Sequence, residues 1–95
     1  MAAYLIVRIR ITREEGWPEN RRRVSELFER HGARCLVRGG PIEALEGNYD
    51  GRRLVVFEFP SMEVIRSVWQ SPEYAEVKAL REGAGEVDVW AVPGV

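Results

Sequence analysis

The chain has 95 residues, of which 45% are hydrophobic and 31% charged, a composition typical of a single soluble globular domain spanning residues 1–95. Its 14 basic and 15 acidic side chains nearly cancel to a formal net charge of −1. No overall field would therefore draw the protein to nucleic acid or to an anionic membrane. The single cysteine, Cys35, is typical of a reducing compartment, and we expect a cytoplasmic protein.

The first half of the chain predicts a strand, a helix and a second strand. Apolar and polar residues alternate from Ala3 to Ile11, and the arginines within this run are unlike a leader or a membrane segment. Helical spacing follows, with Pro18 as a plausible first helical residue and Gly32 as the stop; an earlier start, at the capping-box pair Thr12 and Glu15, is the alternative. The next strand is predicted over 34–39, and 40–52 is predicted to be a loop because it is polar and rich in glycine.

The second half predicts a strand, an interrupted helix and a last strand. Residues 54–59 are β-branched or aromatic for the most part, and Pro60 ends them. A helix is predicted from Ser61 to about Gly83, with an interruption at Ser71 and Pro72, where a cap and a proline suited to the first helical turn restart it. Alternation over 86–92 predicts the final strand.

The order β-α-β-β-α-β predicts an α+β domain with a ferredoxin-like fold, in which a four-stranded antiparallel sheet carries both helical segments on one face. Alternation assigns to the opposite face Tyr4, Ile6, Arg8, Arg10, Leu36, Arg38, Leu54, Val56, Glu58 and Trp90. It turns Cys35 and Val37 toward the helices. An open sheet with this many large apolar groups is more than a monomer usually exposes, so we expect a homodimer that packs sheet on sheet.

Several segments resemble one protein family over nearly the whole chain. They are Tyr4-Leu-Ile-Val7, Leu36-Val-Arg-Gly-Gly40, Leu45-Glu-Gly47, Arg53-Leu-Val-Val-Phe-Glu-Phe-Pro-Ser61 and Ser71-Pro-Glu-Tyr74 with Lys78-Ala-Leu-Arg81. In these segments the chain is similar to the DUF1330 family. The resemblance implies a dimeric α+β barrel of two ferredoxin-like protomers and implies no particular activity. In fold the family resembles small cofactor-free monooxygenases and muconolactone-isomerase-like enzymes, which is an analogy only.

The candidate site consists of Arg8, Arg38 and Glu58, which strand alternation places together on the face opposite the helices. One arginine would pair with Glu58 while another holds an anion through its planar guanidinium. Glu58 is also the candidate general base, and Trp90 would offer a flat wall to an aromatic ligand. The alternative is an ion-pair network across the dimer interface that serves assembly only.

Other residues favour ordinary structural roles. His31 stands where a cation would face the end of a helix, Cys35 is expected to be a buried small hydrophobe, and Arg21 to Arg23 are interleaved with glutamates as on a solvated helix. No spacing of metal ligands occurs, so we expect no metal and no cofactor, although haem with a single ligand stays open. The leading hypothesis is a barrel that binds a small molecule. An extension of this hypothesis is a cofactor-independent activity on a small anionic or aromatic metabolite. The competing hypothesis is a non-enzymatic dimer.

Overall fold

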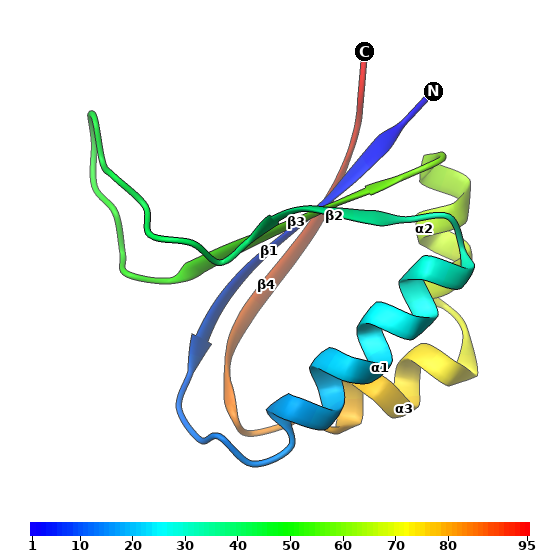
Figure 1. Cartoon of the computed structure of the whole chain (residues 1–95), viewed down its shortest axis with the longest axis horizontal. Coiled ribbons are helices and arrows are strands. Elements are labelled where there is room, and N and C mark those ends of the chain that lie inside the picture. The colour runs from blue at the N-terminus through cyan, green and yellow to red at the C-terminus, as the bar shows by residue number, and fades with distance from the viewer.

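The computed structural model describes residues 1–95 and contains four strands and three helices. In chain order these are β1 (Ala3–Ile11), α1 (Trp17–Arg30), β2 (Arg34–Arg38), β3 (Arg53–Phe59), α2 (Met62–Trp69), α3 (Pro72–Ala79) and β4 (Gly85–Pro93). Figure 1 shows the sheet as one layer and the helices as a second layer on one side of it.

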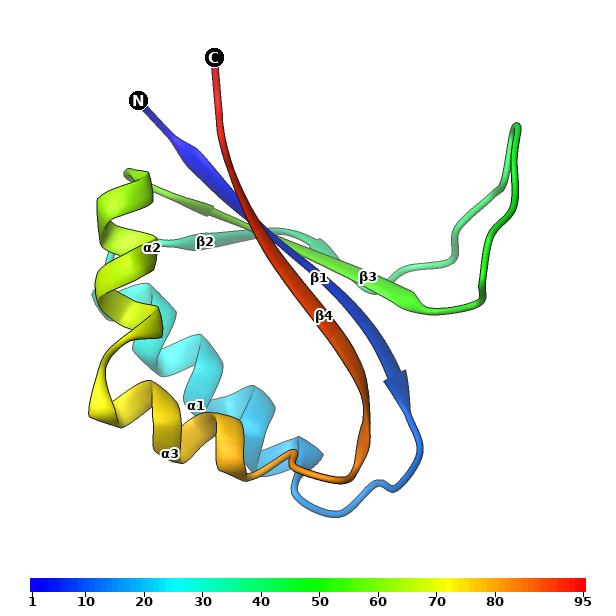
Figure 2. The ribbon, with the colours of Figure 1, turned by 180° about the vertical axis from the view of Figure 1, so that it is seen from behind.

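The sheet has the strand order β2-β3-β1-β4, and every neighbouring pair is antiparallel. All three helices lie on the same side of the sheet, as the view from behind also shows (Figure 2). The other face carries no helix and is called the open face below. This arrangement confirms the predicted α+β, ferredoxin-like fold.

Most element boundaries are confirmed to within a residue or two, with two differences in the helices. Helix α1 begins at Trp17 after Gly16, whose φ of 84° supplies the left-handed N-cap, so the Thr12 and Glu15 pair does not start it. The second helical region stops at Ala79 instead of Gly83, and turns occupy 80–83. The predicted interruption is confirmed, because Ser71 Oγ accepts from Tyr74 N at 3.1 Å and donates to the Val68 carbonyl at 2.7 Å.

The core lies between the sheet and the helices, where alternation on β1 buries Ala3 and Leu5. Phe28 of α1 packs edge to face against two strand residues, Phe57 at 4.9 Å and Phe59 at 5.2 Å between ring centroids. Edge-to-face pairs of this kind add to the stabilisation that burial alone provides. The sheet and α1 are therefore joined by an aromatic cluster at the C-terminal end of β3.

A β-bulge in β2 reverses the expected direction of its last residues. Cys35 pairs with Phe57 on the helix side, but Val37 pairs with Val56 of the open face and Arg38 with Val55 of the helix side. The register shifts between Cys35 and Val37, and one extra residue inverts every later side chain. The predicted orientations of Arg38 and Val37 were therefore wrong, whereas that of Cys35 is correct, and its side chain is half-buried.

The connection from β2 to β3 projects beyond the sheet as an extended arm, residues 40–52 (Figures 1 and 2). Its base is tied to the open face by ion pairs: Asp50 pairs with Arg8, and Arg52 pairs with Asp88 and Glu86. The loop prediction is confirmed.

None of the three helices has the length and apolar character that a bilayer crossing requires.

Candidate functional site

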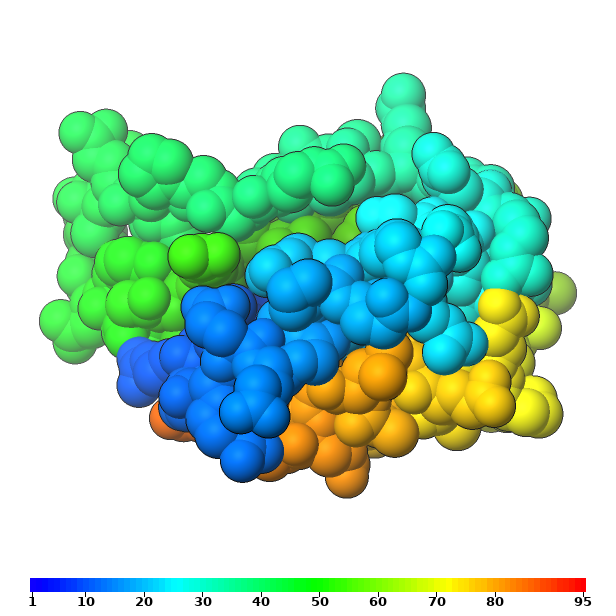
Figure 3. All heavy atoms as spheres, turned by 60° about the horizontal axis from the view of Figure 1, so that its bottom comes forward, coloured from blue at the N-terminus to red at the C-terminus, as the bar shows by residue number.

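A pocket of about 90 Å³ lies between the sheet and the helices, and we call it the central pocket. Twelve of its fifteen lining residues are hydrophobic, and none is acidic. It is lined by Leu5, Val7, Ile9, Trp17, Asn20, Arg21, Val24, Phe28, Val55, Phe57, Trp69, Tyr74, Arg81, Val87 and Val89. Figure 3 shows that the helix side of the molecule is hollowed between α1 and the β2–β3 side of the sheet.

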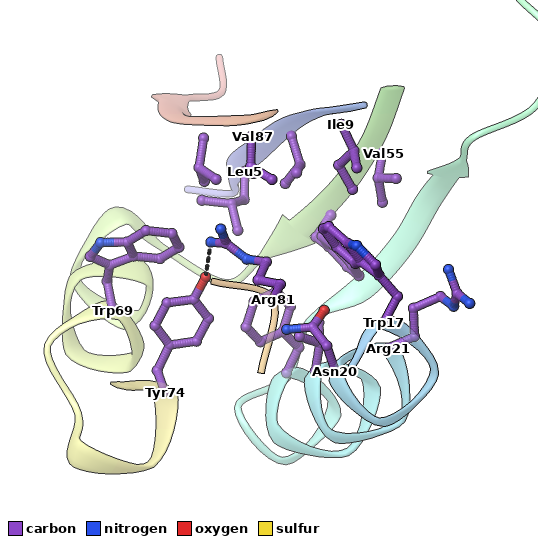
Figure 4. A pocket seen from close by; sticks show the side chains of 15 residues that line it. Leu5, Ile9, Trp17, Asn20, Arg21, Val55, Trp69, Tyr74, Arg81 and Val87 are labelled. Carbon is purple, nitrogen blue, oxygen red and sulfur yellow. Dashed lines mark hydrogen bonds between the residues drawn. The ribbon is translucent and has the colours of Figure 1, made fainter. Parts of the chain in front are cut away.

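Tyr74 and Arg81 are the polar pair of this pocket. Ser71 caps α3 and holds Tyr74 in its first turn, where the ring is buried. The guanidinium of Arg81, from the turn after α3, donates to the Tyr74 hydroxyl at 3.4 Å (Figure 4). Burial raises the pKa of the Tyr74 hydroxyl above its ordinary value of 10.0, against the opposing effect of the Arg81 charge and hydrogen bond. The phenol is therefore neutral and protonated at physiological pH.

Arg81 has no carboxylate partner. Its side chain is half-buried, and it takes part in none of the ion pairs of the protein. By contrast, Arg22 pairs with Glu19 and Glu26 on the outer surface of α1, as the helical spacing indicated. A guanidinium that faces apolar walls without a counterion keeps both its charge and its donors available to a molecule entering the pocket.

Aromatic rings form one wall beside this pair. Trp69 packs on Tyr74 with ring centroids 4.3 Å apart and planes tilted by 32°, and the Lys78 ammonium lies 6.0 Å from the Trp69 ring. Figure 4 shows the Arg81 guanidinium reaching toward Trp69 and Tyr74, with Trp17 and Arg21 on the opposite side. The wall therefore presents flat apolar surface next to the Arg81 guanidinium.

Two further polar side chains of the pocket, Asn20 and Trp17, hold the helices together. Asn20 Nδ2 donates to the Val77 carbonyl at 2.9 Å, and Trp17 Nε1 donates to the Ala84 carbonyl at 3.0 Å. Both bonds are buried and join α1 to α3 and to the turn that follows it. These side chains shape the pocket, while Arg81 and Tyr74 supply the polar groups that a bound molecule could contact.

The residues predicted from the sequence do not form one site. Arg8 pairs with Asp50 and lies 5.4 Å from the Trp90 ring, so these two predicted residues are brought together. Glu58 lies four positions away along the sheet, a separation of about 13 Å, where it accepts from Arg34 Nε at 2.8 Å. It also accepts from the Tyr4 hydroxyl at 3.4 Å.

Arg38 lies apart from both, because the bulge turns it to the helix side. There it lines a second hollow of about 130 Å³, which shares Phe28 and Phe57 with the central pocket and also contains Cys35. Arg8, Glu58 and Trp90 are on the open face as predicted, and Arg38 is not.

Sequence reasoning did not single out Arg81 or Tyr74 as residues of a site. The predicted helix to about Gly83 would place Tyr74 and Arg81, seven residues apart, on one side, but α3 ends at Ala79 and Arg81 lies in the turn that follows. Nowhere do three histidine, cysteine or carboxylate side chains gather in a way that could hold a metal ion.

Comparison with solved structures places the fold among proteins without an assigned function. A protein of unknown function from Rhodopseudomonas palustris superposes with a TM-score of 0.79 at 17% identity, covering 99% of this chain and 82% of the other. A conserved protein of unknown function from Bacteroides thetaiotaomicron, described as a possible oxidoreductase, has a TM-score of 0.59 at 10% identity, with 98% and 97% covered.

A third structure is described as a dimeric protein of unknown function with a ferredoxin-like fold, from Bacteroides fragilis. It has a TM-score of 0.52 at 10% identity, covering 98% of this chain and 96% of the other. These identities establish the fold and nothing finer. No curated protein matches the sequence significantly. Because the family match extends over residues 2–95, the chain belongs to the family described as Domain of unknown function (DUF1330).

Proposed function

We propose that this protein is a homodimer that binds a small anionic molecule in the central pocket of each protomer. One observation carries the proposal: Arg81 brings a guanidinium to an apolar pocket and has no carboxylate partner there. Because Arg81 is half-buried, its guanidinium has lost part of its water without gaining a counterion, and an anion from solution would offset that loss. The Tyr74 hydroxyl beside it adds a second polar contact.

The pocket itself would supply any chemistry on the bound molecule. Tyr74 is a protonated phenol next to a cation, which is suited to stabilise negative charge on a ligand oxygen or to donate a proton to it. The possible oxidoreductase label belongs to a relative of 10% identity and assigns no reaction here. Glu58, the general base expected from the sequence, lies on the open face, so it would serve only a ligand bound there.

Thermal unfolding in the presence of small anions tests the proposal. Binding to the folded state raises Tm, so an anion that occupies the pocket should stabilise the wild type. Arg81→Gln should abolish that rise. Arg13→Gln is the matched control, because Arg13 is exposed, forms no ion pair and does not line the pocket. An equal rise in Arg81→Gln would place the ligand elsewhere and would contradict the proposal.

The second candidate function is assembly alone, through the open face. Large apolar side chains are exposed there; Trp90 is 49% and Val37 is 41% exposed. The charged groups of the same face are already paired within the protomer, Arg8 with Asp50 and Glu58 with Arg34. Two such faces in contact would bury the apolar groups. The protein from Bacteroides fragilis with this fold is described as dimeric, which supports a dimer.

Sedimentation of two variants tests the dimer. Val56 lies centrally on the open face, opposite Ile6 and Val37, and Val56→Asp should give monomers because it would bury a carboxylate without a partner. Ala75→Asp places the same charge on the exposed outer side of α3 and should remain dimeric. A dimeric Val56→Asp would refute the interface. Under assembly alone, no anion would raise Tm through Arg81.

A ligand site on the open face, built from Arg8 and Trp90, is a separate proposal. The two side chains contact each other, and Arg8 lies over the indole ring. Arg8→Gln, rather than Arg81→Gln, would then remove the rise in Tm. The two sites are therefore distinguished by the same measurement.

A further inference from the structure

We infer that the ligand of the central pocket is a short-chain monocarboxylate, with its carboxylate held between Arg81 and Tyr74 and its apolar body against the sheet. This inference rests on the proposed function and specifies its ligand. Three properties of the pocket support it: the number of charges it can neutralise, the donors it presents and the space it leaves.

The charge of the pocket indicates a monoanion. Arg81 is the cation that reaches the interior, and the pocket contains no acidic residue. Arg21 also lines the pocket, but its side chain is exposed and belongs to the outer surface of α1. A dianion would bring a second negative charge among apolar walls without a second internal cation, so its desolvation would be poorly offset.

The donors indicate a carboxylate. A guanidinium is a planar fork whose two N–H groups match the two oxygens of a carboxylate. The Tyr74 hydroxyl accepts a hydrogen bond from Arg81 and donates to no group of the protein, so its own proton is available to a ligand. The burial that raises the Tyr74 pKa keeps that proton in place. Two neighbouring donors thus suit a flat, two-oxygen head group better than a tetrahedral anion.

The space indicates a small apolar body. Strand residues Val7, Val55 and Val89 line the pocket from the sheet, and Trp69 of α2 lines it from the helix side. A cavity of about 150 Å³ accommodates benzene, so a pocket of about 90 Å³ suits a body of about three to five carbon atoms. Isobutyrate has this size and charge, and isobutyramide is its neutral isostere.

Indole N–H resonances in a 1H–15N NMR titration test the inference directly, because the three tryptophans divide between the two faces. Trp17 and Trp69 line the pocket, whereas Trp90 lies on the open face. Isobutyrate should shift the Trp17 and Trp69 resonances and leave that of Trp90 in place. Isobutyramide, benzoate and inorganic phosphate should bind at least about tenfold more weakly, because each lacks the charge, the size or the planar head that the pocket matches.

Variants assign the contacts. Arg81→Gln should abolish the isobutyrate shifts, and Arg81→Lys should retain weak binding because it keeps the charge but loses the fork. Tyr74→Phe removes one hydrogen bond to a charged oxygen and should weaken binding by about ten- to hundredfold. Arg13→Gln should bind isobutyrate like the wild type.

The outcomes separate the inference from the proposed function. If phosphate shifts the pocket resonances through Arg81 and isobutyrate does not, the pocket binds anions and the carboxylate assignment is wrong. If benzoate binds more tightly than isobutyrate, the size argument is wrong. If no anion shifts the Trp17 and Trp69 resonances in an Arg81-dependent manner, both the inference and the proposed function are refuted. Both are also refuted if isobutyramide binds as tightly as isobutyrate.

Discussion

Gly16 offers a stringent test of how closely α1 and α3 approach each other. Its φ is 84°, and a Cβ added there would overlap the Leu80 carbonyl oxygen and lie 3.1 Å from the carbonyl carbon. Gly47 has the same φ of 84°, but a Cβ there would meet nothing within 4 Å. The two alanine variants therefore share the cost of a left-handed backbone and differ in the steric overlap.

The magnitudes follow from these two contributions. A left-handed alanine costs about 1–2 kcal/mol, so Gly47→Ala should lower the free energy of unfolding by about that amount. At Gly16 the obstacle is backbone, so relief requires α1 to move away from α3, and overpacking of this kind costs about 1–3 kcal/mol more. Gly16→Ala should therefore cost about 2–5 kcal/mol in total.

Urea unfolding at one fixed protein concentration measures the difference, because a dimer makes stability depend on concentration. With an m-value of about 1–3 kcal/mol/M, the Gly16→Ala midpoint should lie about 1 M below that of Gly47→Ala. Equal midpoints for the two variants would show that the helices do not meet at Leu80 as described, and the steric reasoning would be refuted.

Three further predictions concern the groups around the central pocket. Asn20→Ala should lower the free energy of unfolding by about 0.5–1.5 kcal/mol, because it removes a buried hydrogen bond to the Val77 carbonyl, which keeps its bond from Leu80 N; chemical denaturation should detect this, and a neutral effect would contradict it. Ser71→Ala should cost about 1 kcal/mol by removing the cap of α3, and Ser71→Thr, which keeps the hydroxyl, should recover most of the loss in the same assay. The raised pKa of Tyr74 predicts that the folded state holds the phenol proton more tightly than the unfolded chain. The resulting contribution to the free energy of unfolding is complete below pH 10.0 and is lost as the pH rises above it. Tyr74→Phe should therefore make unfolding free energy fall less steeply with pH above that value, and parallel pH profiles for the two proteins would disprove the assignment.

Much of the fold follows from local patterns in the sequence. Alternation along β1 and β3 predicts which side chains face the helices, because a period of two repeats without interruption there. Ser71 and Pro72 predict the break between α2 and α3, because capping and proline geometry act over only a few residues. These features depend on the residues themselves and little on the rest of the chain.

The candidate site depends on contacts that sequence patterns do not contain. The bulge in β2 arises from how β2 pairs with β3, and nothing in the local residues marks Leu36 as the extra one. Glu58 meets Arg34 rather than Arg8 because the β2–β3 register places that arginine beside it, and Asp50 reaches Arg8 only because the arm folds back at its base. Arg81 lies in a turn, outside any periodic element, so its direction into the pocket follows from the packing of α3 alone.

The bulge determines which face of the sheet receives the last residues of β2. One unpaired residue decides which layer of the molecule receives the end of β2: because Leu36 is left out of the ladder, Val37 lies on the open face and Arg38 lies on the side that contains the hollows. Deleting Leu36 would remove the extra residue and leave a regular ladder, in which Val37 and Arg38 keep their present partners and faces. The strand can therefore vary in length by one residue at this position without redirecting Arg38 and without altering the rest of the sheet.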